Sequence, residues 1–144
     1  MIVRPFQLDD INHVLALEAE SFKQPWRHEH FLYDFKENPY AFIFIAEQNG
    51  MMLGYIDFWI MFEEATINKI AVLPNLRERS IGSTLLNDAL NRMRVGGVIR
   101  VSLEVRVSNQ TAIDFYSKRG FRVLLRKSQY YQDGEDAFYM VQDL

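Results

Sequence analysis

The sequence predicts an α/β fold with a mixed, mostly antiparallel central sheet flanked by helices. Two observations predict this class. Short aromatic and β-branched segments are typical of strands, and other segments place apolar residues at helical spacing. The two kinds of segment do not alternate regularly, as they would in a doubly wound parallel sheet. The 144 residues suit one domain, 1–144, which is long enough to bury a core without disulfides or metals.

The first part of the chain predicts a strand followed by two helices. Residues 2–6 alternate weakly, as in a strand. A helix follows, with Asp9 and Asp10 in its first turn, where the helix dipole favours acidic side chains, and Pro25 ends it. A short second helix is expected at about 27–36. The apolar positions that predict the first helix are Leu8, Ile11, Leu15 and Phe22.

Three strands are expected next. Residues 40–48 and 51–62 are rich in aromatic and β-branched side chains, and Asn49-Gly50 joins them. Asn-Gly between two such runs is a strong signal for a β-hairpin. Residues 64–73 predict a further strand, which Pro74 ends.

The last part of the chain predicts two helices and three strands. Gly96-Gly97 ends the first helix, and a strand follows at 98–105. Ser108 or Asn109 caps a short helix that Gly120 ends. The segments 121–131 and 136–141 are expected to pair as the final strands. The stripe that predicts the first of these helices consists of Ile81, Leu85, Leu86, Ala89, Leu90 and Met93.

The composition excludes several classes of protein. The absence of cysteine excludes disulfide scaffolds, cysteine-ligated zinc and thiolate nucleophiles. A formal charge of −3 has the wrong sign for a nucleic-acid-binding surface. The N-terminus lacks the apolar run of a signal peptide, and no stretch approaches the length of a membrane helix. We therefore expect a cytoplasmic protein that binds neither nucleic acid nor membranes.

Common cofactor motifs are missing as well. The glycines form neither a dinucleotide-binding fingerprint nor a Walker loop. His28-Glu29-His30 is the one histidine cluster, and residues two apart on a helix point to different faces. No metal site is therefore expected.

The segment 70–83 carries the first functional signal. A buried strand leads through a basic turn into a helix start, where the first N–H groups lack helical partners and the dipole is positive. With Arg77 and Arg79, this makes an anion site that suits a pyrophosphate, and Gly82 lets a phosphate approach the backbone. Taken alone, the segment is explained equally well by a plain loop with two solvated arginines.

A second segment, residues 109–121, carries another pattern that favours the functional interpretation of the first. Residues 77–82 follow the pattern Arg/Gln-x-x-Gly-x-Gly/Ala except at its first glycine, which is Ser80 here. Residues 109–121 follow Asn-x-x-Ala-x-x-x-Tyr-x-x-x-Gly-Phe in full. In this order, the two patterns resemble the signatures of the GNAT superfamily of acyl-CoA N-acyltransferases. The resemblance implies a GNAT-like sheet, acetyl-CoA as co-substrate, and direct transfer in a ternary complex. The second pattern is met by Asn109, Ala112, Tyr116, Gly120 and Phe121.

Shorter motifs narrow the resemblance to RimI-type enzymes, which acetylate the N-terminal alanine of a small-subunit ribosomal protein. This implies that the partner is the N-terminal peptide of a protein, such as a ribosomal protein, and that the enzyme is a monomer or weak dimer. Ser80 departs from the pattern at its first glycine, and Lys69 stands where such chains usually carry Asn. The motifs are Ser21-Phe22, Pro25-Trp26, Glu64-Ala65, Ile70-Ala71-Val72, Leu103-Glu104-Val105-Arg106, Ser108-Asn109, Tyr130-Tyr131 and Glu135-Asp136-Ala137.

The resemblance also implies roles for individual residues. Glu104 matches the general base and Tyr116 the general acid. Other residues match the coenzyme site, namely Ile70, Ala71, Val72, Arg77, Glu78, Arg79, Ser80, Ile81, Gly82, Ser83 and Asn109. The acceptor site is expected to contain Trp26, Glu64, Tyr130, Tyr131, Glu135 and Asp136, with Glu64 as a second candidate base.

Each role has a structural alternative. Glu104 is also explained as a surface strand residue paired with an arginine, and Tyr116 as a core aromatic. Asn109 is also explained as a helix cap, and Trp26 and the tyrosines as packing. Two other functions stay open from the sequence: acetylation of a small-molecule amine such as a polyamine or aminoglycoside, and a non-catalytic acyl-CoA-binding module.

Overall fold

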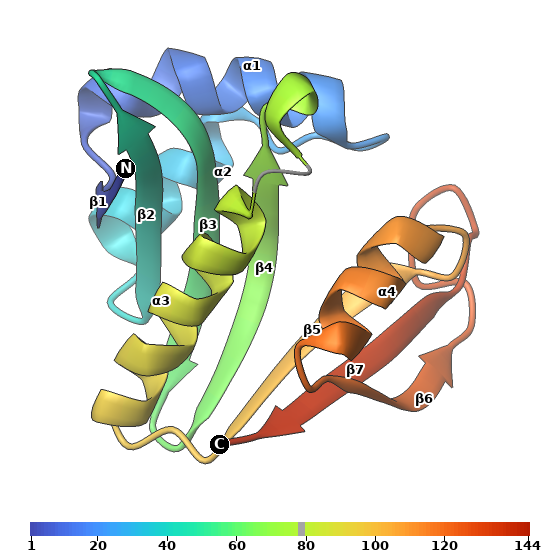
Figure 1. Ribbon diagram of the computed structural model, residues 1–144. Helices are drawn as coiled ribbons and strands as arrows, with labels where there is room; N and C mark the ends of the chain where they lie inside the picture. The colour runs from blue at the N-terminus through green and yellow to red at the C-terminus, as the bar shows by residue number, and fades with distance from the viewer. Residues whose placement is uncertain (78–79) are drawn as a thin grey trace.

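A seven-stranded sheet forms the centre of the molecule in a computed structural model, which describes residues 1–77 and 80–144. The strand order across the sheet is β1-β2-β3-β4-β5-β7-β6 (Figure 1). The order of strands and helices along the chain is the predicted one. The strands are β1 (Ile2–Pro5), β2 (Ala41–Gln48), β3 (Met51–Met61), β4 (Glu64–Val72), β5 (Arg100–Arg106), β6 (Arg122–Lys127) and β7 (Ala137–Asp143).

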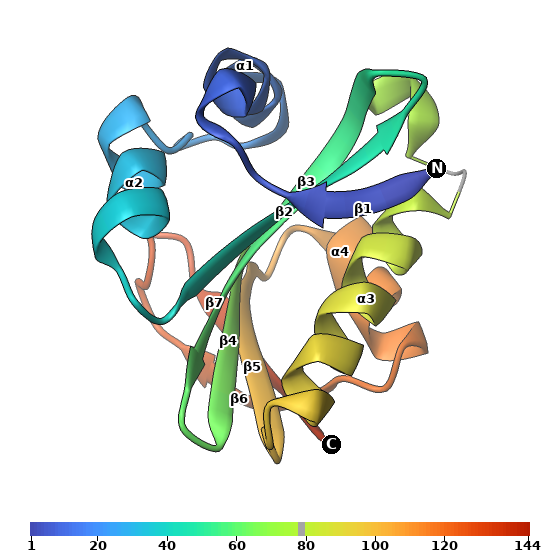
Figure 2. The ribbon, with the colours of Figure 1, turned by 90° about the vertical axis from the view of Figure 1, so that its left-hand side faces the viewer.

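Among the residues that the structure describes, four helices cover the two faces of the sheet. Helices α1 (Ile11–Ser21) and α2 (His28–Leu32) lie on one face, and α3 (Ile81–Val95) and α4 (Gln110–Lys118) lie on the other (Figure 2). Short helical turns precede or extend them: η1 (Leu8–Asp10), η2 (Tyr33–Glu37) and η3 (Pro74–Leu76). Strands β4 and β5 pair in parallel through the α3 crossover, and the other neighbouring strands pair antiparallel. The mixed, mostly antiparallel sheet predicted from the sequence is confirmed.

Each face of the sheet has its own hydrophobic core. The larger core packs α3 and α4 against the sheet through residues such as Leu85, Leu103 and Tyr116. The smaller core lies under α1 and α2 and includes Leu17, Phe31 and Tyr55. A carboxylate, Glu18, is completely buried beside this second core.

The parallel pair β4–β5 separates soon after it forms. Within the described residues, Glu64–Thr66 of β4 pair with Arg100–Ser102 of β5, and the register ends there. A bulge lies at this point in β4, because Asp57 of β3 pairs with Lys69 while Phe58 pairs with Ile67, which leaves Asn68 as the extra residue. The two strands diverge beyond it (Figure 1). This divergence opens the sheet between its two halves.

Two local expectations are corrected. The first strand of the final pair is shorter than predicted, because β6 ends at Lys127 rather than at Tyr131, whereas β7 extends to Asp143, beyond the predicted end at residue 141. Gln129 has a φ of 49°, and its N–H donates to Asp136 Oδ1 at 2.8 Å, so the chain turns away from the sheet there. The first helix begins as the turn η1, and α1 proper starts at Ile11. By contrast, the Asn49-Gly50 hairpin forms as predicted, with positive φ values at both residues.

The described part of the chain contains no helix that is long and apolar enough to cross a membrane.

Candidate active site

A cleft of about 710 Å³ lies where β4 and β5 diverge. The loop between α1 and α2 forms one wall, and the loop between β6 and β7 contributes Tyr130 and Tyr131. The floor comes from β4, β5 and the start of α4. Eleven of the residues that the sequence assigned to the site line this one cleft: Trp26, Ile70, Ala71, Val72, Arg77, Gly82, Glu104, Asn109, Tyr116, Tyr130 and Tyr131.

The end of β4 offers a free backbone edge to the cleft. Ile70, Ala71 and Val72 pair with β3 on one side. On the other side, the β5 register has already ended at Thr66, within the described residues. Backbone groups in a strand alternate between its two edges, so part of this segment's hydrogen-bonding groups face the opening. This edge can bind an extended ligand in the manner of an added strand.

The start of α3 lies beside this edge. Ser80 is the N-cap residue and adopts a left-handed conformation, with φ 62° and ψ 10°, which is the conformation that favours glycine. Its carbonyl oxygen accepts hydrogen bonds from Ser83 Oγ at 3.0 Å and Thr84 Oγ1 at 2.9 Å. Ser80 therefore keeps the backbone shape of the glycine that the motif calls for, although it carries a side chain. The predicted contacts of Glu78 and Arg79 lie outside the described residues.

Two residues lie where the start of α3 meets the cleft. An added Cβ at Gly82 would lie 3.3 Å from Cε1 of Phe115, so α3 and α4 approach each other closely at that glycine. Arg77 donates from Nε to the carbonyl oxygen of Val72 at 3.1 Å and from a terminal nitrogen to Ser21 Oγ at 3.2 Å. Both acceptors are neutral, so these contacts orient the guanidinium and leave its charge for an anion.

Glu104 lies on β5 with its side chain on the open face, because its neighbours Leu103 and Val105 are buried in the core. One carboxylate oxygen accepts a hydrogen bond from Nζ of Lys127 at 2.8 Å. The ion pair raises the pKa of Lys127. The partner is therefore a lysine rather than the arginine of the structural alternative, and it comes from β6, which lies on the far side of β7 from β5.

Tyr116 and Asn109 contribute from α4. Tyr116 is buried, packs edge-on against Phe115 and Phe121, and lines the cleft. Burial raises the pKa of its hydroxyl well above the usual value, so the group stays protonated at neutral pH and can act as a proton donor. Asn109 is the N-cap of α4, and its Oδ1 accepts from the backbone N–H of Ala112 at 3.2 Å. The cap that the sequence offered as its alternative role is present.

The loop between β6 and β7 is held by Arg106. Its guanidinium binds Asp133 at 2.8 Å and Glu135 at 2.9 Å and lies 4.0 Å from the ring centroid of Tyr131. Hydrogen bonds from Ser108 and Arg106 lower the pKa of Glu135 to about 2. Asp136 accepts from Arg126 and from the backbone of Gln129. Glu135 and Asp136 therefore fix the loop that carries the tyrosines and do not line the cleft.

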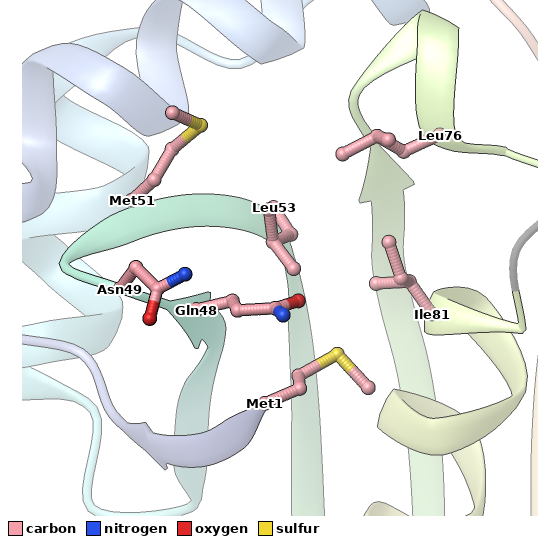
Figure 3. A pocket seen from close by; sticks show the side chains of 7 residues that line it. All are labelled: Met1, Gln48, Asn49, Met51, Leu53, Leu76 and Ile81. Atoms are coloured by element: carbon pink, nitrogen blue, oxygen red, sulfur yellow. The ribbon is translucent and has the colours of Figure 1, made fainter.

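Three other expected residues lie elsewhere. Glu64 begins β4, where this strand still pairs with β5, some six residues before Ile70, or about 20 Å along a strand. Ile81 lines a separate apolar cavity of about 420 Å³ and faces Leu53 and the N-terminal Met1 (Figure 3). Ser83 lies within the first turn of α3 and bonds to Ser80. The cleft as described thus contains one of the two candidate bases.

Several residues of the cleft are not predicted as site residues by the sequence motifs. Lys69 was singled out as a departure, but nothing in the sequence pairs it with Glu18, which lies 3.0 Å away. Asn68 also lines the cleft, and its amide donates to the buried Asp57 at 3.0 Å. Within the described residues, no group of three or more His, Asp or Glu side chains is arranged to hold a metal ion.

A splayed parallel pair with a helix N-terminus at its mouth defines the class to which the chain belongs. Residues 11–121 match the family model described as the Acetyltransferase (GNAT) family. The chain therefore belongs to the GNAT family and is an acyltransferase that acts on an amine with acetyl-CoA as acyl donor.

Three relatives place it more closely. A Bacillus subtilis protein, whose name provisionally assigns it as a ribosomal protein bS18-alanine N-acetyltransferase, is 41% identical over 96% of this chain and 92% of its own. An N-alpha-acetyltransferase of Sulfurisphaera tokodaii is 32% identical over 99% of this chain and 92% of its own. The crystal structure of the Escherichia coli ribosomal-protein-S18-alanine N-acetyltransferase superposes with a TM-score of 0.89 at 28% identity, covering 99% of this chain and 92% of that one.

The conformation of Ser80 gives the first prediction. Replacement by glycine removes the cost of a left-handed serine, so Ser80→Gly should raise the free energy of unfolding by about 1 kcal/mol and tighten acetyl-CoA binding. Thermal unfolding and isothermal titration calorimetry measure the two effects. Ser83→Gly is the matched control inside α3, and it should lower stability by about 1 kcal/mol. Weaker coenzyme binding by Ser80→Gly would show that the serine side chain itself contributes to the site.

Proposed function

We propose that this enzyme transfers the acetyl group of acetyl-CoA to the α-amine of an N-terminal alanine, and that its acceptor is the N-terminus of a protein such as ribosomal protein bS18. The observation that carries the proposal is that one cleft joins the free edge of β4 to Glu104, between two loops that bear aromatic side chains. The names of the relatives support this acceptor class.

The coenzyme fits the residues on one side of the cleft. The pyrophosphate needs N–H donors and positive charge, which the start of α3 and Arg77 supply. The pantetheine arm carries amides, which suit the unpaired edge at Ile70–Val72. Asn109 stands at the start of α4 on the opposite side of the opening and is a further polar contact.

The acceptor enters between the two loops. Trp26 lies on the α1–α2 side and Tyr130 and Tyr131 on the β6–β7 side, so an extended peptide would pass between aromatic surfaces. Among the described residues that line the cleft, four are basic and one is a carboxylate. The basic residues are Lys23, Lys69, Arg77 and Arg106, and the carboxylate is Glu104. This charge balance does not suit a polyamine or an aminoglycoside, which would need an acidic pocket.

The transfer follows from these positions. Glu104 takes a proton from the α-ammonium, directly or through one water, because a neutral amine is needed to attack the thioester carbonyl. The new N–C bond forms, and a backbone N–H of the Ile70–Val72 edge stabilises the oxyanion. The C–S bond then breaks, and Tyr116 gives its proton to the departing thiolate. The nitrogen, which is positively charged after the attack, loses its second proton to form the amide, and this proton restores the Tyr116 hydroxyl through water. The ammonium group of the substrate competes with Lys127 for Glu104.

Removal of the base should separate catalysis from coenzyme binding. Glu104→Gln keeps the size of the side chain but cannot accept the proton, so kcat should fall by about 10²–10⁴-fold while the Kd for acetyl-CoA changes little. Steady-state kinetics and calorimetry measure the two quantities. Glu64→Gln is the comparison at the other candidate base and should leave kcat close to wild type. A loss below threefold for Glu104→Gln would move the proton transfer to Glu64 or to water, and the kcat of Glu64→Gln would distinguish the two.

The choice of acceptor distinguishes the proposed function from acetylation of lysine or of a small-molecule amine. A peptide that begins with Ala should be acetylated on its α-amine, whereas a lysine inside the same peptide should not. The α-amine has a pKa of about 7.7–8.0 against about 10.4 for lysine, so far more of it is neutral at pH 7. Mass spectrometry of the products locates the acetyl group, and an N-terminally blocked copy of the peptide is the control. Preference for lysine or for a free polyamine would contradict the proposal.

A further inference from the structure

A buried ionic cluster lies beneath the α1–α2 loop, next to the cleft but outside the chemistry described above. Its centre is Glu18 of α1, whose side chain is fully buried. One carboxylate oxygen accepts from the backbone N–H of Trp26 at 2.8 Å and from Nζ of Lys69 at 3.0 Å. The other accepts from the hydroxyl of Tyr55. Glu18 thus has partners from a helix-connecting loop, from β4 and from β3.

Lys69 connects this carboxylate to the wall of the cleft. Its Nζ lies 3.9 Å from the ring centroid of Phe22 and 5.6 Å from that of Trp26. A cation at this distance from an aromatic face is attracted by the ring, more strongly where water is excluded. The Lys69 side chain is 15% exposed and lines the cleft. One ammonium group therefore holds both ends of the loop that separates α1 from α2.

The other described contacts between this loop and the rest of the site are longer and more exposed. Gln24 accepts from Arg106 at 3.5 Å, and Lys23, whose side chain is 66% exposed, lies 3.8 Å from Glu135. Exposed pairs of this kind contribute little to stability. Phe22 and Trp26 also pack against the core under α1 and α2, where Trp26 meets the buried Phe31 edge-on at 5.3 Å between ring centroids. Among the polar contacts described, those of Glu18 and Lys69 are therefore the main ones that hold this wall.

We propose that Lys69 is a positioning residue for the acceptor: it fixes Phe22 and Trp26 in the conformation that binds the N-terminal peptide, and it takes no part in proton transfer or in coenzyme binding. The inference rests on the proposed function, because it assigns this wall to the acceptor. It predicts a change in the KM for the peptide at nearly constant kcat and constant affinity for acetyl-CoA.

The variants must avoid leaving a buried charge without a partner. Lys69→Met alone would strand the Glu18 carboxylate in the core, so that variant is open to failure of folding. The double variant Glu18→Gln/Lys69→Met removes both buried charges and keeps the side-chain volumes. The amide oxygen of the new glutamine can still accept from the backbone N–H of Trp26. Lys69→Arg is the conservative variant, because a guanidinium can keep both the ion pair and the aromatic contact.

Kinetics on an Ala-initiated peptide give the first readout. The double variant should raise the KM for the peptide about 5- to 30-fold, with kcat and the acetyl-CoA Kd within about twofold of wild type. Lys69→Arg should restore a KM close to wild type. Met93→Ala, which opens the buried core under α3 far from the loop, is the control for lost stability and should leave the KM unchanged.

Fluorescence gives a readout that needs no turnover. The chain has two tryptophans, so Trp59→Phe leaves Trp26 as the single reporter in the loop. In that background, the double variant should increase the acrylamide quenching of Trp26, and Lys69→Arg should not. If wild type acetylates no N-terminal peptide, the proposed function fails while the quenching still tests the link. Two results would overturn the assignment of Lys69. One is an unchanged KM for the peptide in the double variant together with unchanged quenching of Trp26. The other is a lower kcat or a weaker affinity for acetyl-CoA without a change in the KM for the peptide.

Discussion

The separation of β4 from β5 is the constraint on which the rest of the site depends. Two parallel neighbours pair over a short stretch and then part at the bulge in β4, where Asn68 is the extra residue. The amide of Asn68 donates to Asp57, a carboxyl that is wholly buried in β3. Burial and the nearby Asp34 raise the pKa of Asp57 well above its usual range, so the neutral form can be accommodated in the core. A local irregularity in one strand thus opens the sheet, frees the β4 edge and exposes Glu104 on β5.

Ion pairs hold the surroundings of this opening in place. Glu18 and Lys69 fix the α1–α2 wall, Arg106 and Glu135 fix the loop with the tyrosines, and Lys127 meets Glu104 at the floor. The first pair is largely withdrawn from solvent and the third is partly exposed, so the carboxylate that must exchange its partner is the more accessible one. The buried Glu18–Lys69 pair therefore holds the α1–α2 loop in place, whereas Lys127 can be displaced from Glu104 by the ammonium group of the acceptor.

Local patterns in the sequence predicted most of the fold. The Asn49-Gly50 hairpin, the apolar stripe of α3 and the cap at Asn109 each depend on residues a few positions apart, and all three form. The two GNAT signatures predict that the starts of α3 and α4 serve one coenzyme site, and Gly82 and Asn109 line the same cleft. Contacts between distant segments could not be predicted from local patterns. Glu18 and Lys69 lie far apart in sequence, and Lys127 comes from a different strand than Glu104. The early end of β6 also depends on a non-local contact, from Asp136 to Gln129, which overrides the strand-like composition of that segment.

A crystal structure with a conjugate of coenzyme A and an Ala-initiated peptide tests the account most directly. The pantetheine should lie along the free edge at Ile70–Val72 and the pyrophosphate at the start of α3. The acceptor nitrogen should lie within reach of Glu104, directly or through one water. Lys127 should have released Glu104, and the peptide should pass between Trp26 and the tyrosine pair. A conjugate bound outside the opening between β4 and β5, or with its acceptor nitrogen remote from Glu104, would contradict the central claim that the divergence of these two strands creates the active site.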